Sequence, residues 1–168
     1  MTVYSIAAVA ENKAIGKNND LIWKLPDDMK FFKDSTLNQV IITGRKNYES
    51  IPHNFRPLPN RINIILTRDR NYQAEGAVIC HSLSDAIDYC EKHNHESVYV
   101  IGGGQVYREA LKEGLVDVML ITQVHAEFEA DTFYPEFEKS EWTKEIISEH
   151  GIDERHDYPF TIEKWTKN

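Results

Sequence analysis

The chain has 168 residues, of which 41% are hydrophobic and 27% are charged, and its net charge is −8. This length predicts a single domain over 1–168 with one hydrophobic core, and the negative charge argues against nucleic acid or an anionic membrane as a partner. No apolar run approaches the roughly 18 residues of a membrane span, and no signal segment follows Met1. We therefore expect a soluble cytoplasmic protein that acts as a monomer on small molecules.

Short apolar runs predict buried β-strands at 3–10, 40–43, 62–67, 77–80, 98–101 and 116–124. Helices are expected to begin at Pro26, after Gly44, at Leu83 with Ser82 as its cap, and after Gly104. Towards the end of the chain, 144–148 and 160–165 have the pattern of two antiparallel strands. Together these elements predict an α/β fold, with a mostly parallel, doubly wound sheet of about eight strands, an antiparallel C-terminal edge and about four helices.

Two further features bear on function. The segment 11–24 is much longer than the usual connection of about four to six residues, so it is predicted to be an ordered lid beside a ligand site. The only cysteines, Cys80 and Cys90, lie in an apolar run and a helical pattern, which is typical of reduced packing thiols. No disulfide framework and no metal site are expected.

Asp28 is the first candidate for a functional side chain. It lies in the first turn of the helix that begins at Pro26, and Phe31 and Phe32 share its helical face at spacings of three and four. Trp23 arrives from the preceding loop. A carboxylate between apolar walls needs a polar partner, so Asp28 is a candidate ligand-binding group. These residues alone also allow a solvated acid that only complements the helix dipole.

Two strand ends meet helix starts through glycine, at Gly44 and at 102–104, and both offer backbone N–H groups to a phosphate. Between residues 45 and 70 the chain carries six basic side chains against two acidic ones, which favours a small, highly anionic ligand. Arg68 follows the third strand, where it can take an extra phosphate on an adenosine ribose and so favour NADPH over NADH. His81 is a minor phosphate candidate.

Five further histidines show no ligand spacing, and we expect them at the surface: His93, His95, His125, His150 and His156. No serine or cysteine sits on an identifiable nucleophile elbow, so acyl or phosphoryl transfer is not expected.

A series of short motifs runs in order over nearly the whole chain. It comprises Ala8, Ile15-Gly16, Leu21 with Trp23, Leu25-Pro26-x-Asp28, Phe32, Thr36, Gly44-Arg45, Glu49-Ser50-Ile51, Pro57-Leu58-Pro59-Asn60-Arg61, Ile101-Gly102-Gly103 and Asp131-Thr132-Phe133. This series resembles the dihydrofolate reductase family, and the motifs are far more specific jointly than singly. The resemblance implies NADPH-dependent reduction of 7,8-dihydrofolate to 5,6,7,8-tetrahydrofolate, with hydride passing to C6 and a solvent proton to N5.

The resemblance also implies roles for particular side chains. Asp28 would hold the pteridine through its N3 and 2-amino groups, Thr122 would steady the carboxylate, and Trp23 would hold a water nearby. The catalytic group implied is Leu21, Trp23, Asp28 and Thr122. The substrate-binding group implied is Ala8, Met29, Phe32, Ile51, Leu58, Arg61 and Ile101, in which Arg61 takes the glutamate carboxylate as a bidentate fork.

The cofactor-binding group implied is Ala8, Ile15, Gly16, Gly44, Arg45, Lys46, Asn47, Thr67, Arg68, His81, Gly103, Gly104, Gln105, Val106 and Tyr107. Within it, residues 45–47 and 103–106 would bind the pyrophosphate, while Thr67 and Arg68 would take the 2′-phosphate. The resemblance further implies a cis peptide bond between Gly102 and Gly103.

The chain departs from the family pattern in three places. Ile22 stands where proline commonly precedes the tryptophan, Ala130 stands where glycine often precedes Asp131, and the segment 52–55 is longer than in the shortest members. Two alternatives stay open: a pteridine- or nucleotide-binding protein without turnover, and a related NADPH-dependent reductase that acts on a pyrimidine.

Overall fold

The computed structural model describes residues 1–18 and 22–168. An eight-stranded sheet forms its centre, in the order β5-β4-β3-β6-β1-β7-β10-β9. Its strands are β1 (Thr2–Val9), β3 (Val40–Gly44), β4 (Ile62–Leu66), β5 (Val78–Cys80), β6 (Ser97–Val100), β7 (Val118–Val124), β9 (Trp142–His150) and β10 (Phe160–Lys167). The six strands from β5 to β7 run parallel, and β10 and β9 are antiparallel, so the predicted sheet and its C-terminal edge are confirmed.

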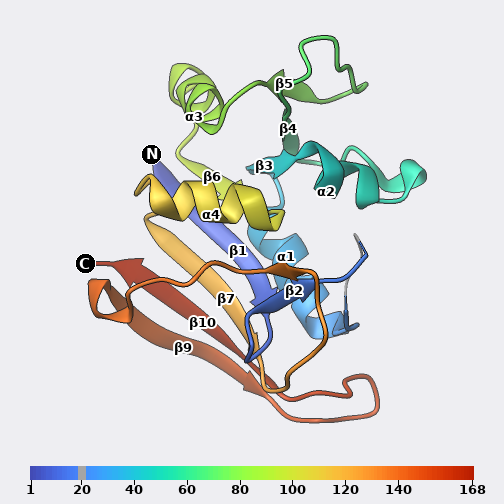
Figure 1. Ribbon diagram of the computed structural model, residues 1–168, viewed down its shortest axis with the longest axis vertical. Coiled ribbons are helices and arrows are strands. Elements are labelled where there is room, and N and C mark those ends of the chain that lie inside the picture. Colours follow the sequence, from blue (N-terminus) through green and yellow to red (C-terminus); the bar gives the residue numbers. More distant parts are fainter. Residues whose placement is uncertain (19–21) are drawn as a thin grey trace.

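Helices cover both faces of this sheet (Figure 1). They are α1 (Pro26–Thr36), α2 (Arg45–Ser50), α3 (Leu83–Lys92) and α4 (Gly104–Lys112), with short 3-10 turns at His53–Phe55 and Lys139–Glu141. Apolar residues of α3 and α4 pack with one set of strand side chains, including Val9 and Ile121. Phe31 and Phe32 of α1 pack with the other set, which includes Ile41 and Leu120. Since successive strand residues point to opposite faces, α1 lies across the sheet from α3 and α4.

The helix starts follow the predicted signals. Pro26 is the first residue of α1, and its missing N–H is no loss because helix N-terminal donors have no partner within the helix. The Ser82 side chain accepts a hydrogen bond from the backbone N–H of Asp85 at 3.0 Å, so it caps α3 as predicted. At the start of α1, by contrast, the N-cap residue Leu25 supplies no side-chain cap.

A second, two-stranded sheet lies beside the main one. It pairs β2 (Ala14–Gly16) with β8 (Thr132–Phe133), and β2 falls inside the segment predicted to be a lid. Asp131 Oδ2 accepts a hydrogen bond from the backbone N–H of Asn18 at 2.8 Å, and Lys17 pairs with Glu129 at 3.0 Å. The first part of the predicted lid is therefore an ordered strand tied to 129–133. Leu21 lies outside the described residues.

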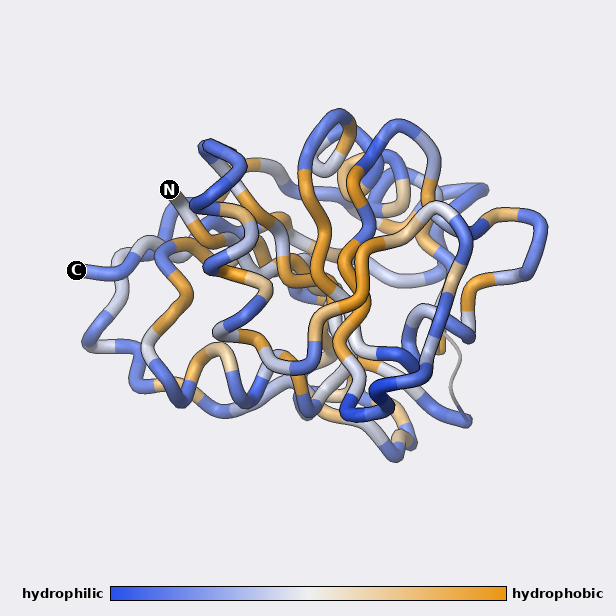
Figure 2. The backbone as a smooth tube through the Cα atoms, turned by 90° about the horizontal axis from the view of Figure 1, so that it is seen from above, coloured by the Kyte–Doolittle hydropathy of each residue, from blue (hydrophilic) through white to orange (hydrophobic). Residues whose placement is uncertain are grey.

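Apolar segments gather in the central strands, while the loops at the periphery are hydrophilic (Figure 2). Cys80 and Cys90 are both free and buried, which confirms their packing role. Among residues 1–18 and 22–168, no helix combines the length and the apolar character that a bilayer crossing requires. The expectation that His93, His95, His125, His150 and His156 lie at the surface is wrong for His156, whose exposed fraction is 1%.

Candidate active site

Asp28 lies in the first turn of α1, where the helix faces β7. Thr122 of β7 donates a hydrogen bond from Oγ1 to Asp28 Oδ1 at 2.5 Å, across 94 residues of sequence. Thr122 is paired with Ala8 of β1 and with Ile162 of β10, so its position is fixed by two neighbouring strands. The alternative of a fully solvated acid does not hold, because this carboxylate is largely buried and has a specific partner.

Burial raises the pKa of Asp28 above its ordinary value, because a charge loses solvation in an apolar surrounding. The hydrogen bond from Thr122 and the charge of His150 act in the opposite direction, but they are smaller causes. A carboxylate in this state is a strong acceptor for two N–H donors of a flat heterocycle. It also favours binding of a ligand that carries a positive charge.

Apolar side chains surround this carboxylate on the α1 face of the sheet. Trp23 is buried and its ring lies 5.1 Å from that of Phe128. Phe31 packs against two apolar clusters. One contains Trp23, and the other contains the predicted substrate residues Phe32, Leu58 and Ile101. Of the two other predicted wall residues, Met29 is 49% exposed beside Asp28 and Ile51 is partly buried.

Arg61 is held at the end of α1. Its Nη1 donates to Thr36 Oγ1 at 3.1 Å and its Nε donates to the carbonyl oxygen of Pro59 at 3.0 Å. Partial burial lowers the pKa of this guanidinium, which still remains positively charged at neutral pH. An arginine oriented in this way is suited to a carboxylate ligand.

Asn63 is a positioning residue that sequence reasoning missed. It is 1% exposed, and its side chain exchanges hydrogen bonds with the backbone N–H and carbonyl of Leu58 at 2.9 and 3.0 Å. It also donates to the carbonyl oxygen of Arg61 at 3.1 Å. The sequence does contain a signal for this role, since Asn63 is a single amide inside the apolar run 62–66. A polar side chain buried in such a strand needs hydrogen-bond partners.

The two glycine-bearing strand ends lie side by side. The backbone N–H of Gly44 donates to the carbonyl oxygen of Gly102 at 2.9 Å, and Thr43 Oγ1 donates to the same oxygen at 3.2 Å. Asn47 Nδ2 donates to Thr43 Oγ1 at 2.9 Å. The peptide bond between Gly102 and Gly103 is cis, as the family resemblance implied, and a second cis bond precedes Pro57.

Side chains larger than hydrogen have little room in this turn. Gly102 has a φ of +119°, and a Cβ on it would lie 3.2 Å from the Tyr107 ring. A Cβ on Gly44 would lie 3.2 Å from Val106 Cγ2. Neither Gly44 nor Gly103, the N-cap residues of α2 and α4, brings a side-chain cap, so backbone donors at both helix starts stay available to an anion.

Cationic side chains lie next to this turn. Arg45 is half-exposed and Lys46 is exposed at the start of α2. Further along, Arg68 is exposed directly after β4. His81 Nδ1 lies 2.9 Å from the carbonyl oxygen of Thr67, so these three predicted phosphate ligands are neighbours. Glycine-lined backbone and nearby cations together fit a pyrophosphate with an additional phosphate group.

The remaining predicted cofactor residues divide by exposure. Gln105 is exposed, whereas Val106 and Tyr107 are buried. The Tyr107 hydroxyl donates to the carbonyl oxygen of Ile6 at 2.7 Å, so its ring supports the Gly102 turn from the core side. Ile15 and Gly16 lie in β2, and the carbonyl oxygen of Gly16 accepts from the backbone N–H of Asp131 at 3.1 Å.

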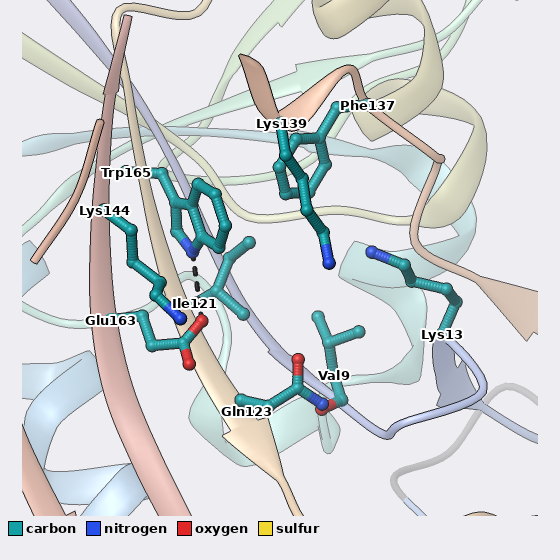
Figure 3. A pocket seen from close by; sticks show the side chains of 9 residues that line it. All are labelled: Val9, Lys13, Ile121, Gln123, Phe137, Lys139, Lys144, Glu163 and Trp165. Atoms are coloured by element: carbon teal, nitrogen blue, oxygen red, sulfur yellow. Dashed lines mark hydrogen bonds between the residues drawn. The ribbon is translucent and has the colours of Figure 1, made fainter. Parts of the chain in front are cut away.

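A separate cavity of about 280 Å³ lies on the face of the sheet opposite Asp28 (Figure 3). It is lined by Val9, Lys13, Ile121, Gln123, Phe137, Lys139, Lys144, Glu163 and Trp165. Within residues 1–18 and 22–168, this lining contains none of the predicted site residues. The buried Glu163 carboxylate is satisfied internally, by Trp165 Nε1 at 3.0 Å and Thr161 Oγ1 at 3.2 Å. The candidate site is therefore placed by the Asp28 and Gly102 geometry rather than by this cavity.

Known proteins match the chain along almost its full length. A sequence model of the family described as dihydrofolate reductase matches residues 2–167. A dihydrofolate reductase of Staphylococcus haemolyticus is 42% identical over 156 residues, which cover 92% of this chain and 89% of the relative. One from Bacillus subtilis (strain 168) is 40% identical over 163 residues and covers 96% and 92%.

A solved structure agrees with these sequence matches. It is the dihydrofolate reductase from Enterococcus faecalis complexed with NADP(H) and RAB-propyl, which superposes with a TM-score of 0.88 at 38% identity and covers 99% of this chain and 96% of that one. Sequence, fold and the geometry around Asp28 and Gly102 agree. The chain belongs to the dihydrofolate reductase family.

Proposed function

We propose that the site built from Asp28, the apolar α1 face, Arg61 and the Gly102 turn is the active site of an NADPH-dependent dihydrofolate reductase. The reaction itself follows from the family: 7,8-dihydrofolate is reduced to 5,6,7,8-tetrahydrofolate at the expense of NADPH. The single observation that carries the site is the largely buried carboxylate of Asp28 with Thr122 as its donor.

Asp28 binds the pteridine through paired hydrogen bonds to N3 and the 2-amino group. Thr122 fixes one carboxylate oxygen, so the other faces the ring with a defined orientation. Because Asp28 is desolvated, its negative charge favours the form of the substrate that is protonated at N5, which is the better hydride acceptor. Trp23 holds a water next to Asp28, and the proton reaches N5 from solvent.

The folate is oriented at both ends. Phe32, Leu58, Ile51 and Met29 enclose its ring and linker, and Arg61 takes the glutamate carboxylate. Leu21 keeps its proposed catalytic role on the strength of the family pattern alone. Fixing the flat ring and the carboxylate together orders the substrate before reaction.

NADPH, when bound, supplies the hydride for C6. Ala8 and Ile101 place its nicotinamide, Ile15 and Gly16 flank it, and the backbone of 44–47 and 103–106 binds its pyrophosphate. Thr67 and Arg68, with His81 beside them, take the 2′-phosphate. The donor set fits the group, because backbone N–H groups at the starts of α2 and α4 lie near cations, and a Cβ would be crowded at Gly44 and Gly102.

The test uses the purified protein with NADPH and dihydrofolate, and follows the NADPH absorbance. Asp28→Asn is expected to keep the fold and NADPH affinity but to lower kcat by about 100-fold, since general acid–base and charge effects of this kind contribute about 10² to 10⁴. The deficit becomes smaller at acid pH, where the substrate is already protonated. Asp34→Asn, an exposed acid of the same helix that pairs with Lys30, is the matched control. Full activity of Asp28→Asn at neutral pH would refute the assignment.

Two alternatives give different results in the same assay. A binding protein without turnover would take up both ligands and leave NADPH unoxidised, and a pyrimidine reductase would not depend on Arg61. We also propose that the protein is a cytoplasmic monomer. Its net charge of −8 supports the further proposal that it has no nucleic-acid partners.

A further inference from the structure

His156 is a buried histidine that the reaction does not use directly. It lies in the loop between β9 and β10, with an exposed fraction of 1%. Its Nε2 is 3.1 Å from the backbone nitrogen of Asp27 and its Nδ1 is 2.8 Å from Asp153 Oδ1. Since the Asp27 N–H donates, Nε2 is the acceptor, and the ring proton resides on Nδ1 and is donated to Asp153. The geometry thus selects one neutral tautomer.

The helix that receives this contact lacks a cap of its own. Leu25 has no side-chain acceptor, and Pro26 has no N–H. The first backbone donor of α1 is therefore that of Asp27, and His156 supplies its acceptor from a segment 129 residues away. Asp28, the next residue along the helix, is the carboxylate proposed to hold the pteridine.

The loop is folded so that the ring is presented in one orientation. Asp153 and His156 exchange backbone hydrogen bonds at 3.0 and 3.3 Å. Asp153 Oδ1 also accepts from the backbone N–H of Arg155 at 2.8 Å, and the hydrogen bond from His156 lowers the pKa of Asp153. The imidazole packs against the fully buried Phe160, with ring centres 5.6 Å apart.

The same loop connects to the other side of Asp28. Phe160 begins β10 and pairs with Val124 of β7, and two residues further on Ile162 pairs with Thr122. Thr122 is the donor to Asp28. His156, from the loop that leads into β10, and Thr122, from the neighbouring strand β7, therefore both reach the first turn of α1, one at its backbone and one at its carboxylate.

We propose that His156 is a positioning residue that caps helix α1 from the β9–β10 loop and so sets the place of Asp28 for folate, while NADPH binding is independent of it. The inference rests on the proposed function of Asp28. The cofactor-binding turn at Gly44 and Gly102 lies on β3 and β6, on the other side of β1, and it shares no described hydrogen bond with His156.

The wild-type protein gives the first test without any substitution. Imidazole ¹H–¹⁵N spectra are expected to show His156 neutral with its proton on Nδ1, and the amide of Asp27 is expected to exchange slowly with solvent. A proton on Nε2 would overturn the proposal, because that nitrogen then cannot accept. These measurements stand even if the protein proves unable to turn over dihydrofolate, so they separate this proposal from the proposed function.

The second test compares three variants. His156→Phe keeps an aromatic ring against Phe160 but removes the acceptor, so the KM for dihydrofolate should rise by about tenfold, the NADPH KM should stay within about twofold, and Asp27 amide exchange should accelerate. His156→Gln places a side-chain oxygen near the position of Nε2, so it should recover most of the loss. Glu154→Ala, an exposed residue of the same turn, is the matched control.

A His156→Phe enzyme with unchanged folate KM, or with equal losses for folate and NADPH, would refute the positioning role. Equal losses would indicate general destabilisation. If His156→Phe does not fold, the comparison of His156→Gln with Glu154→Ala, together with the wild-type tautomer, decides the question.

Discussion

Asp28 combines two requirements that conflict within one side chain. Ligand binding needs a carboxylate that is shielded from water, whereas folding is opposed by a buried charge. Burial raises the pKa of this group, so the folded protein holds its proton more tightly than the unfolded chain does. The carboxylate thus reduces stability once it ionises, so its position is explained by ligand binding rather than by folding.

Asp28→Asn is therefore expected to stabilise the protein at neutral pH while it abolishes most activity. A raised folded-state pKa means that the ionised wild type loses stability as the pH rises from the ordinary value of 3.8 through the folded value. The amide does not ionise, and its oxygen can still accept from Thr122. Urea unfolding of both proteins at neutral pH and near pH 3 measures this difference. A stability gain that is the same at both pH values would contradict the argument.

Individual residues were predictable where their role depends on local sequence. Asp28 follows Pro26 in a recognisable helix start, and it shares a face with two phenylalanines. Its partner Thr122 came from the family resemblance, since no local pattern joins residues 94 positions apart. The role of His156 was missed because its neighbours in the sequence are polar. Only the fold brings its ring to the start of α1, which has no side-chain cap of its own.

Among the elements, the short strands were hardest to foresee. β2 and β8 have three and two residues, too few for a period of two to appear, and their partners are distant in sequence. The parallel strands of the main sheet were found because each is a continuous apolar run, and β9 and β10 were found from their antiparallel pattern. The ends of all eight strands shift by no more than two residues from the prediction. The segment predicted as a lid is thus partly a strand.

The start of helix α4 provides a test at this scale. A Cβ on Gly104 would lie 2.9 Å from Thr132 Cγ2 and 3.2 Å from the carbonyl oxygen of Phe133. Gly104→Ala should therefore push α4 away from β8, with a cost of about 1 to 3 kcal/mol in the free energy of unfolding and about tenfold weaker NADPH binding. Chemical denaturation and fluorescence titration with NADPH measure both effects.

Gly151→Ala is the control, because a Cβ there meets nothing within 4 Å. If Gly104→Ala binds NADPH as tightly as this control does, then close contact between α4 and β8 does not shape the phosphate-binding turn.

For the molecule as a whole, the order of the strands decides function. Alternation of strands and helices predicted the parallel sheet, but the placement of β1 between β6 and β7 is set by long-range packing that one sequence does not reveal. That placement puts the cofactor turn on one side of β1 and Asp28 with Thr122 on the other. The site therefore exists only once the whole sheet has formed.

The uneven charge of the molecule yields another prediction. A cationic segment in a protein of net charge −8 is expected to attract a multiply charged cofactor through an electrostatic field that salt screens. The Kd for NADPH should rise several-fold when the salt concentration increases from about 0.05 to 0.5 M, because the Debye length then falls several-fold to about 4 Å. Arg68→Gln should flatten this dependence and reduce the preference for NADPH over NADH.

Lys144→Gln removes an exposed cation beside the separate cavity and serves as the comparison. Equal salt dependence in both variants would mean that Arg68 is not a main source of the attraction for the cofactor.

The strand registers also determine where the two chain termini lie, and therefore where another protein can be fused to this one. Tyr4 near the start of β1 lies beside Val118 at the start of β7, and Thr166 near the end of β10 is paired with that same residue. Both termini thus emerge at the amino edge of the parallel strands (Figure 1). The proposed ligand site lies at the carboxyl edge, so a second enzyme or an affinity tag fused at either terminus is expected to leave access to it unobstructed.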